Sequence, residues 1–298
     1  MPILITTILG QVDLLITADN DEYSQLSRQE RCRDALDRYS HDLPDYYAED
    51  VTGNATGYYK LTGTSAALTY WRDQFSAVQS IEYPAATIAS NETPQYLNNT
   101  DWREDYLVSG DYYLYLPNHS PAATETMRVT YSRPYLWTES TTTQAVAQTG
   151  HGLSEDDYIY YNGSAWVEAT ERTGTHIVSA VADADSFTAA TLAVDIPLQH
   201  FFPFCQLVAC MCCEAIAVRY SRTNDSTITS DSVNHTTRAT EFRNRATELC
   251  AMYRMGVGLP AIDQTTGEPR LKAASAYADL DANPEWRPGR RYLFHGNR

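Results

Sequence analysis

The chain has 298 residues, enough for one or two domains, since a domain commonly holds about 100–200 residues. Its 43% hydrophobic content is that of an ordinary folded protein, but 38 acidic residues against 22 basic ones give a formal net charge of −16. This charge favours solubility and argues against a nucleic-acid-binding protein, because affinity for the phosphate backbone depends on lysine and arginine.

The N-terminal stretch MPILITTILGQVDLLI is apolar but does not have the pattern of a targeting segment. It carries no basic start and is interrupted by Gly10, Gln11 and Asp13, so it predicts neither a secretion signal nor a membrane span. We therefore expect synthesis in the cytoplasm, no association with a membrane, and no disulfides, which are rare in that compartment.

Residues 1–57 are expected to contribute two helices to a helical core. Apolar residues recur at helical spacing over residues 6–17. In the second helix, Ser27 and Glu30 have the spacing of a capping box, in which the hydroxyl and the carboxylate satisfy free amides of the first turn. Pro44 ends this helix.

Residues 58–137 are expected to form a β region. The segment DYYLYLP is bounded by Gly110 and Pro117, and the segment ETMRVTYSRPYLW alternates apolar and polar residues with a period of two. Because only NHSPAAT separates the two segments, they predict a β-hairpin with a longish loop.

Residues 138–196 are expected to form a small inserted β module, either a barrel or a sandwich. The pair Asn162–Gly163 lies between YIYY and AWVEA, a strong hairpin signal. THIVSAV and SFTAATL follow, separated by ADAD. This acidic turn could bind calcium weakly, but aspartates are common in hairpin turns for conformational reasons, and we favour the turn.

The chain is then expected to return to helix over residues 197–260. Apolar residues run almost all round a helix up to Arg219, which predicts burial on nearly every side. A last helix ends near Gly256, and residues 261–298 show no sustained periodicity and are expected to form an extended arm. The predicted fold class is α+β: a helical bundle built from N- and C-terminal helices, with a β region and an inserted β module.

Four of the six cysteines lie in one nine-residue stretch inside the apolar segment, and Cys210 and Cys213 form a C-x-x-C pair. A structural zinc site usually has four ligands in two spaced pairs. No second pair exists, since Cys32 and Cys250 are solitary in the sequence. A buried free cysteine behaves as a small hydrophobe, so we favour core packing over a metal or redox role and expect no metal or cofactor.

No motif of a known catalytic class is found, and the chain is predicted not to be an enzyme. The segment DLDANPE begins like a calcium loop, but Pro284 replaces the required glycine and Arg290 replaces the bidentate glutamate. A hydrolase whose catalytic groups meet only in the folded chain stays an open alternative.

The order of these segments resembles head-to-tail connector, or adaptor, proteins of tailed bacteriophages and related viruses. The resemblance rests on TTILGQVDLLIT followed by EYSQLSRQERCRDALDRYSHDLP, then SIEYPA, the segment YYLYLPNHSPAATETMRVTYSRPY, and DSVNHTTRATEFRNRATELCAMY as a closing helix. Separately, HGLSEDDYIYYNGSAWVEA is similar to the FCCH-like β modules of virion proteins. It departs from them at Asp156–Asp157, where those modules usually have Gly-Asp.

The resemblance implies a structural protein in the virion neck, between capsid and tail, made in the host cytoplasm. Its implied partners are further copies of itself in a dodecameric ring, the portal protein, and a downstream neck or tail protein. Double-stranded DNA would pass through the lumen without specific binding. The alternative function is a receptor- or glycan-binding tail protein, for which the many tyrosines are suitable, although such proteins are commonly β-dominated trimers.

The C-terminal stretch EWRPGRRYLFHGNR reverses the charge of an acidic chain. Arginine and aromatic residues are the types that dominate interface hot spots. We therefore predict an arm that docks on the portal; a solvated tail and a weak nucleic-acid contact are the alternatives. The residues of this predicted arm are Trp286, Arg287, Arg290, Arg291, Tyr292 and Phe294.

Overall fold

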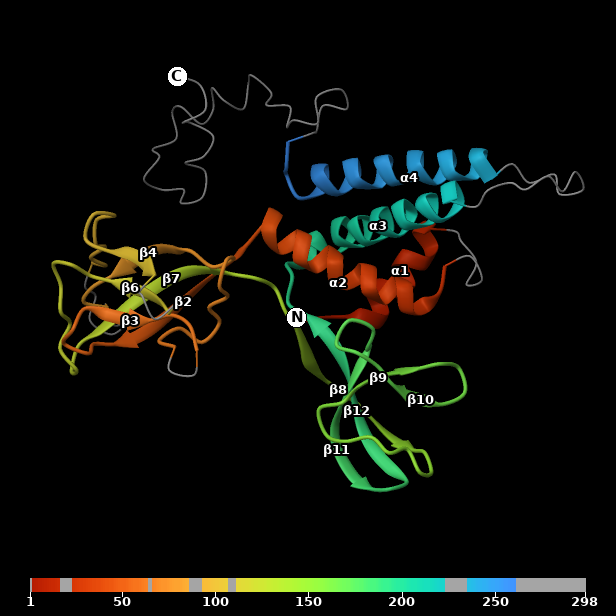
Figure 1. Ribbon diagram of the computed structural model, residues 1–298, viewed down its shortest axis with the longest axis horizontal. Helices are drawn as coiled ribbons and strands as arrows, with labels where there is room; N and C mark the ends of the chain where they lie inside the picture. The colour runs from red at the N-terminus through yellow and green to blue at the C-terminus, as the bar shows by residue number, and fades with distance from the viewer. Residues whose placement is uncertain are drawn as a thin grey trace, which may run out of the picture. The chain divides into compact units, whose positions relative to one another are not determined.

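The computed structural model shows a mixed α and β protein, with four α-helices and several antiparallel sheets among the residues that it describes (Figure 1). It divides into two compact units: within the described residues, one holds the chain up to Tyr39 and from Tyr135 onward, and the other holds residues 40–134. The predicted class is confirmed as a mixed α and β fold in which helices precede and follow most of the β segments. The residues that the structure describes are 2–16, 23–63, 66–85, 93–106, 111–222 and 235–260.

The first unit begins with two helices, α1 (Ile5–Ile16) and α2 (Gln25–Asp42). Helix α2 begins at Gln25, two residues before Ser27, which was predicted to cap its start. The Ser24 hydroxyl accepts the Ser27 amide at 3.3 Å, and the Ser24 carbonyl accepts the Arg28 amide. The predicted capping box is therefore wrong, because Ser24 already satisfies an amide of the first turn.

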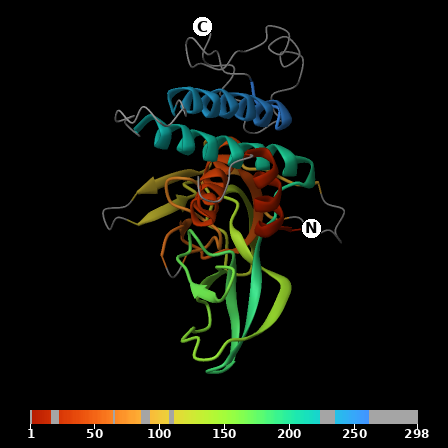
Figure 2. The ribbon, with the colours of Figure 1, turned by 90° about the vertical axis from the view of Figure 1, so that its right-hand side faces the viewer.

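Helix α3 (Phe201–Arg222) follows a short 3₁₀ turn, η1 (Leu198–His200), and precedes α4 (His235–Gly256). In both ribbon views α3 lies between α4 on one side and α1 and α2 on the other (Figures 1 and 2). Tyr39 of α2 fastens this packing: its hydroxyl lies 2.6 Å from Nδ1 of His200, and its ring packs edge-on against Phe204.

An open six-stranded sheet completes the first unit. Its strand order is β1-β12-β11-β9-β10. Strands β1 and β11 pair with different parts of one edge of β12, and β8 pairs with the opposite edge. No closed barrel is formed by the described strands, so the predicted barrel is wrong. The bounds are β1 (Ile3–Leu4), β8 (Trp137–Ala147), β9 (Tyr158–Tyr161), β10 (Trp166–Glu168), β11 (His176–Asp183) and β12 (Ser186–Val194).

Both predicted hairpins of this sheet are confirmed. Strands β9 and β10 pair antiparallel. At their turn the side-chain oxygen of Asn162 accepts the amide of Ala165, and Gly163 has a φ of +98°, a value that favours glycine. Strands β11 and β12 pair around Asp183 and Ser186. Their turn was predictable because it is local in sequence.

The sheet is joined to the helices through several contacts. Strand β1 runs directly into α1 and pairs with the C-terminal end of β12. Arg33 of α2 donates from Nη2 to the Gly174 carbonyl at 2.9 Å and lies 4.7 Å from the ring centroid of Trp137. These contacts bury a guanidinium against an aromatic face and a carbonyl, so the sheet and helices form one unit.

The second unit contains two three-stranded antiparallel sheets with orders β2-β7-β4 and β3-β6-β5. Their apolar faces share one buried core, which includes Tyr59, Leu114, Met127, Val129 and Tyr131. The strands are β2 (Asp45–Thr52), β3 (Tyr58–Lys60), β4 (Val78–Glu82), β5 (Arg103–Tyr106), β6 (Tyr112–Tyr115) and β7 (Thr126–Arg133).

Two expectations for this region are wrong. Strands β6 and β7 were expected to pair as a hairpin, but β6 pairs with β3 and β5 while β7 pairs with β2 and β4. The intervening segment therefore passes from one sheet to the other. In addition, β2 lies inside residues 1–57, where only helices were expected. Its exposure alternates in the structure, but its sequence, DYYAEDVT, does not alternate apolar and polar residues, so periodicity gave no strand signal.

A buried histidine gives the first unit a pH-dependent stability. Burial lowers the pKa of His176 to about 4, below the value of about 6.5 expected for the unfolded chain. Between these two pH values the unfolded chain binds more protons than the folded chain, so the contribution of His176 to the free energy of unfolding falls as the pH falls. We expect His176→Gln to reduce the loss of unfolding free energy between about pH 7 and about pH 4.5 by roughly 1–2 kcal/mol, allowing for partial solvent screening.

Denaturant unfolding at a series of pH values measures this difference. Two parallel curves for the wild type and the variant, offset by a constant amount, would contradict it. In that case His176 would contribute only through its contacts with the Trp166 ring, whose centroid lies 4.7 Å away, and with the Thr175 hydroxyl, 2.9 Å from Nδ1.

Candidate functional site

The predicted portal-docking residues, Trp286, Arg287, Arg290, Arg291, Tyr292 and Phe294, lie outside the described residues. The calcium-like segment DLDANPE lies outside them as well. Among the described residues, the helical hairpin formed by α3 and α4 carries the cysteines and the clearest exposed apolar surface, so the candidate site is built there.

Helix α3 is buried on nearly all sides by helices of its own chain. Its buried side chains include Phe204, Leu207, Val208 and Ile216. By length and composition the segment Leu198–Arg222 is apolar enough to cross a membrane, but its burial by α1, α2 and α4 is that of a core helix. The apolar character of α3 therefore requires no second copy of the chain.

Helices α3 and α4 run antiparallel in a register that several side-chain contacts define. Gly256 packs on Pro203 so closely that a Cβ there would lie 2.5 Å from Cγ of the proline. Farther along, Gln206 contacts Met252, and the rings of Tyr220 and Phe242 stack with centroids 6.0 Å apart. Among residues 238–256, the buried side chains of α4 form a narrow stripe: Ala239, Ala246, Leu249 and Tyr253.

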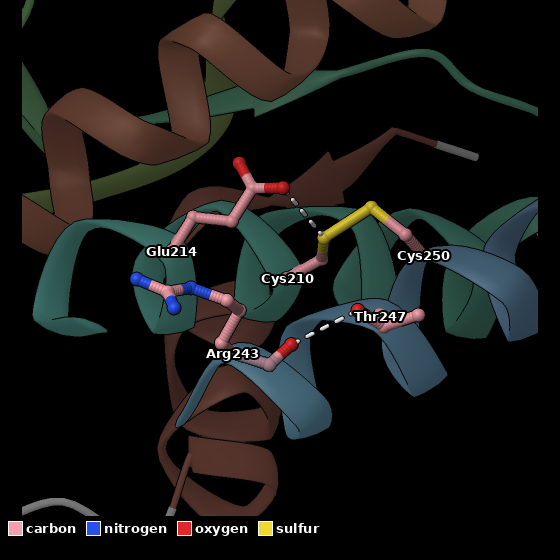
Figure 3. Close-up of a disulfide and its surroundings, with 5 residues drawn as sticks. All are labelled: Cys210, Glu214, Arg243, Thr247 and Cys250. Carbon is pink, nitrogen blue, oxygen red and sulfur yellow. Dashed lines mark hydrogen bonds between the residues drawn. A yellow bond between two sulfur atoms is a disulfide. The ribbon is translucent and has the colours of Figure 1, made fainter. Parts of the chain in front are cut away.

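Cys210 of α3 and Cys250 of α4 form a disulfide across this interface, with Cα atoms 5.5 Å apart (Figure 3). Two expectations are thereby corrected: the chain does contain a disulfide, and Cys210 and Cys250, expected to be free cysteines that pack in the core, are bonded to each other. Glu214, one turn after Cys210, places Oε1 3.8 Å from the Cys210 sulfur.

The other four cysteines are free and buried: Cys32, Cys205, Cys212 and Cys213. Burial raises the pKa of Cys205 to about 12 and that of Cys213 to about 11, and it raises the pKa of Cys32 and Cys212 well above the ordinary range. A thiol held protonated is a poor metal ligand and a poor nucleophile. The packing interpretation is confirmed for these four residues.

Cys210, Cys250 and Glu214 are the one group of at least three candidate metal-ligating residues within the described ranges. Their ligand atoms lie within 4.8 Å of one another. While the disulfide is formed, however, neither sulfur is the thiolate that a zinc ion requires.

The acidic turn between β11 and β12 uses its carboxylates for local hydrogen bonds. Oδ1 of Asp183 accepts the Asp185 amide and the Ser186 hydroxyl, both at 2.8 Å. Oδ1 of Asp185 accepts the Gly150 amide at 3.0 Å. These contacts account for both aspartates as turn-forming residues, in agreement with the interpretation favoured above.

In the second unit, two clusters combine tyrosine and arginine. Tyr58 and Tyr115 stack with ring centroids 4.2 Å apart, and Arg103 lies over the Tyr115 ring at 5.1 Å. Arg133 lies over both Tyr47 and Tyr70. Each of these four rings therefore contacts at least one other side chain, while Tyr58 and Tyr70 each stay 40% exposed.

An apolar surface is exposed where α3 begins and α4 ends. Phe202 is 62% exposed and Leu198 75%, one turn apart, while Met255 of α4 is 69% exposed. The contacts of Pro203 with Gly256 and of Gln206 with Met252 bring these helix ends together. Large apolar side chains clustered at one end of a hairpin are typical of a protein contact surface. We name Leu198, Phe202, Met252 and Met255 the hairpin-end surface.

Comparison with known proteins identifies no relative: no family model, no curated protein and no solved structure matches the chain.

The disulfide should account for a measurable part of the stability of the helical unit. It closes a loop of 40 residues, for which the loss of unfolded-chain entropy corresponds to about 4 kcal/mol. We expect reduction to lower the unfolding free energy by up to this amount in the wild type and to leave a Cys210→Ala/Cys250→Ala variant unchanged. Denaturant unfolding with and without reductant measures both.

Thiol titration of the denatured protein provides the control. Four thiols are expected before reduction and six after it. Six thiols in freshly purified, unreduced protein, together with stability that ignores reductant, would show that the bond does not form in solution.

Proposed function

We propose that this chain is a structural, non-enzymatic virion protein that forms a ring connecting the portal to the tail. The observation that carries the proposal is that helices from the two ends of the chain pack into one unit, while residues 40–134 between them form a separate β unit. This is the organisation that the resemblance to head-to-tail connectors implies. In this proposal α1 to α4 form the helical bundle of the connector core.

The charge of the chain supports passage of DNA without specific binding. A net charge of −16 repels a phosphate backbone, so double-stranded DNA in the lumen of the ring would not be held. A conduit benefits from this property, since every retained phosphate contact would slow transport.

Ring formation needs a surface that contacts a neighbouring molecule, and the hairpin-end surface is suitable for that role. Its side chains are exposed in the single chain, and burying such side chains contributes favourably to association. In this proposal twelve copies form the ring, the portal lies on one side, and a downstream neck or tail protein lies on the other.

The alternative, a receptor- or glycan-binding tail protein, is favoured by the exposed tyrosines of the second unit, among them Tyr46, Tyr58 and Tyr96. Aromatic side chains supply platforms for ligands, but the stacking of Tyr58 on Tyr115 leaves only part of that surface accessible. A stable trimer that binds glycans, with no affinity for portal-bearing heads, would support this alternative over the connector.

Removal of the predicted arm tests portal attachment. We expect a chain truncated after Asn283 to keep the helical unit folded and to lose attachment to portal-bearing heads, because the arginine and aromatic residues of the arm supply the binding contacts. Co-sedimentation with heads and circular dichroism measure the two outcomes.

A full-length variant with Ser in place of Arg287, Arg290 and Arg291 is the matched control for chain length. We expect it to bind as weakly as the truncated chain. Wild-type occupancy of heads by both variants would exclude the arm as the docking element.

Substitution of the hairpin-end surface tests ring assembly. We expect Phe202→Ser with Met255→Ser to reduce assembly on heads about tenfold or more while leaving thermal stability close to that of the wild type, because both side chains are largely exposed. Quantitative electron microscopy of decorated heads measures assembly.

Leu14→Ser is the control, since Leu14 is 73% exposed on α1 but lies outside the hairpin-end surface. Equal loss of assembly in this control would show that general surface polarity, and not this surface, determines the result.

A further inference from the structure

The contact between Glu214 and the disulfide has an unusual chemical property. Oε1 of Glu214 lies 3.8 Å from the sulfur of Cys210, and the dashed line in Figure 3 joins these two atoms. A disulfide sulfur carries no hydrogen, so in the oxidised protein it cannot donate to the carboxylate. After reduction, the Cys210 thiol gains a hydrogen and Glu214 is already positioned to accept it.

We propose that Cys210, Cys250 and Glu214 form a redox-modification site that exchanges with low-molecular-mass thiols, and that Glu214 stabilises the dithiol form by accepting a hydrogen bond from Cys210. This inference does not depend on the connector function. Glu214 acts here as a positioning residue, since the sulfur atoms carry out the exchange.

The two sulfurs differ in accessibility, which sets the order of the steps. Cys250 is partly exposed, whereas Cys210 is fully buried. A small thiolate attacks the sulfur of Cys250 and forms a mixed disulfide, and Cys210 leaves and takes a proton. A second thiolate attacks the mixed disulfide, releasing Cys250 as a thiolate and the reagent as its disulfide. Two electrons pass from two small thiols to the protein disulfide.

The remaining thiols do not compete in this exchange. All four are buried, and burial raises their pKa values, which keeps them protonated and unreactive. The exchange is therefore confined to the pair that links α3 and α4.

The state of this pair determines how firmly α4 is held. Over residues 238–256, whose side chains the structure describes, only a narrow stripe of α4 is buried, and two of the four buried side chains there are the alanines Ala239 and Ala246. Small side chains bury little apolar area and so contribute little free energy. With the disulfide open, α4 should separate from α3 more often than the other helices open.

A redox titration tests the assignment of Glu214. The purified wild type, Glu214→Gln and Glu248→Gln are equilibrated in glutathione buffers of known ratio, and thiols are trapped and counted by mass spectrometry. We expect Glu214→Gln to lower the dithiol-to-disulfide ratio about threefold to tenfold, because the amide oxygen of glutamine still accepts a hydrogen bond but lacks the charge that makes the bond to a carboxylate roughly twice as strong. Glu248→Gln is the matched control, because Glu248 is also exposed on the hairpin but pairs with Arg245, and it should titrate as the wild type does.

Hydrogen exchange measured in the same buffers tests the consequence for α4. We expect reduction to accelerate amide exchange in α4 and to leave α1 unchanged. Identical titrations of Glu214→Gln and the wild type would overturn the role of Glu214. Failure of glutathione to open the bond in the folded protein would overturn the exchange site itself.

A metal site in the reduced protein is the competing assignment, since the same three residues place their ligand atoms within 4.8 Å. Reduced wild type and reduced Glu214→Gln are therefore dialysed against Zn²⁺ and analysed for bound metal. Stoichiometric zinc in the wild type that is lost in the variant would overturn the hydrogen-bond assignment in favour of a metal ligand. We expect neither protein to retain zinc.

Discussion

The burial of α3 among three other helices is the constraint on which the first unit depends. A helix with apolar side chains on nearly every side must be covered all round, and no single neighbour can do this. Helices α1 and α2 cover one side and α4 covers the other (Figures 1 and 2). At the start of α3, the ring of Phe204 packs edge-on against that of Tyr39 on α2. The ends of the chain must therefore meet before α3 is stable.

Features that depend on neighbouring residues could be predicted from the sequence, and features that depend on distant residues could not. The Asn162–Gly163 turn and the apolar run of α3 are local signals, and both appear in the structure. Proximity in sequence predicts that β6 pairs with β7, yet β6 pairs with β3 and β5 while β7 pairs with β2 and β4. Strand pairing depends on which apolar faces share a core, here the core around Leu114 and Val129. Which faces come together depends on residues far apart in the sequence.

The candidate site illustrates the same limit. A C-x-x-C pair draws attention to Cys210 and Cys213, but the partner of Cys210 lies 40 residues away on the antiparallel helix. A signal for this pairing does exist in the sequence. If Pro203 and Gly256 are aligned as the ends of a helical hairpin, Cys210 and Cys250 fall at nearly the same level. Glu214 had no signal of its own, because its importance depends only on its distance from a sulfur atom.

The distribution of charge within the first unit bears on how a connector ring would be oriented. Residues 138–196 contain nine acidic residues against the single Arg172, whereas α3 and α4 contain six arginines against three glutamates. A surface that faces passing DNA should be the acidic one, because the phosphates would otherwise be retained. In the connector proposal, the arginines of the hairpin then belong at contacts between proteins, where arginine is an effective interface residue. If the connector proposal holds, the sheet that carries the acidic residues is the part of this unit best suited to line the path of the DNA.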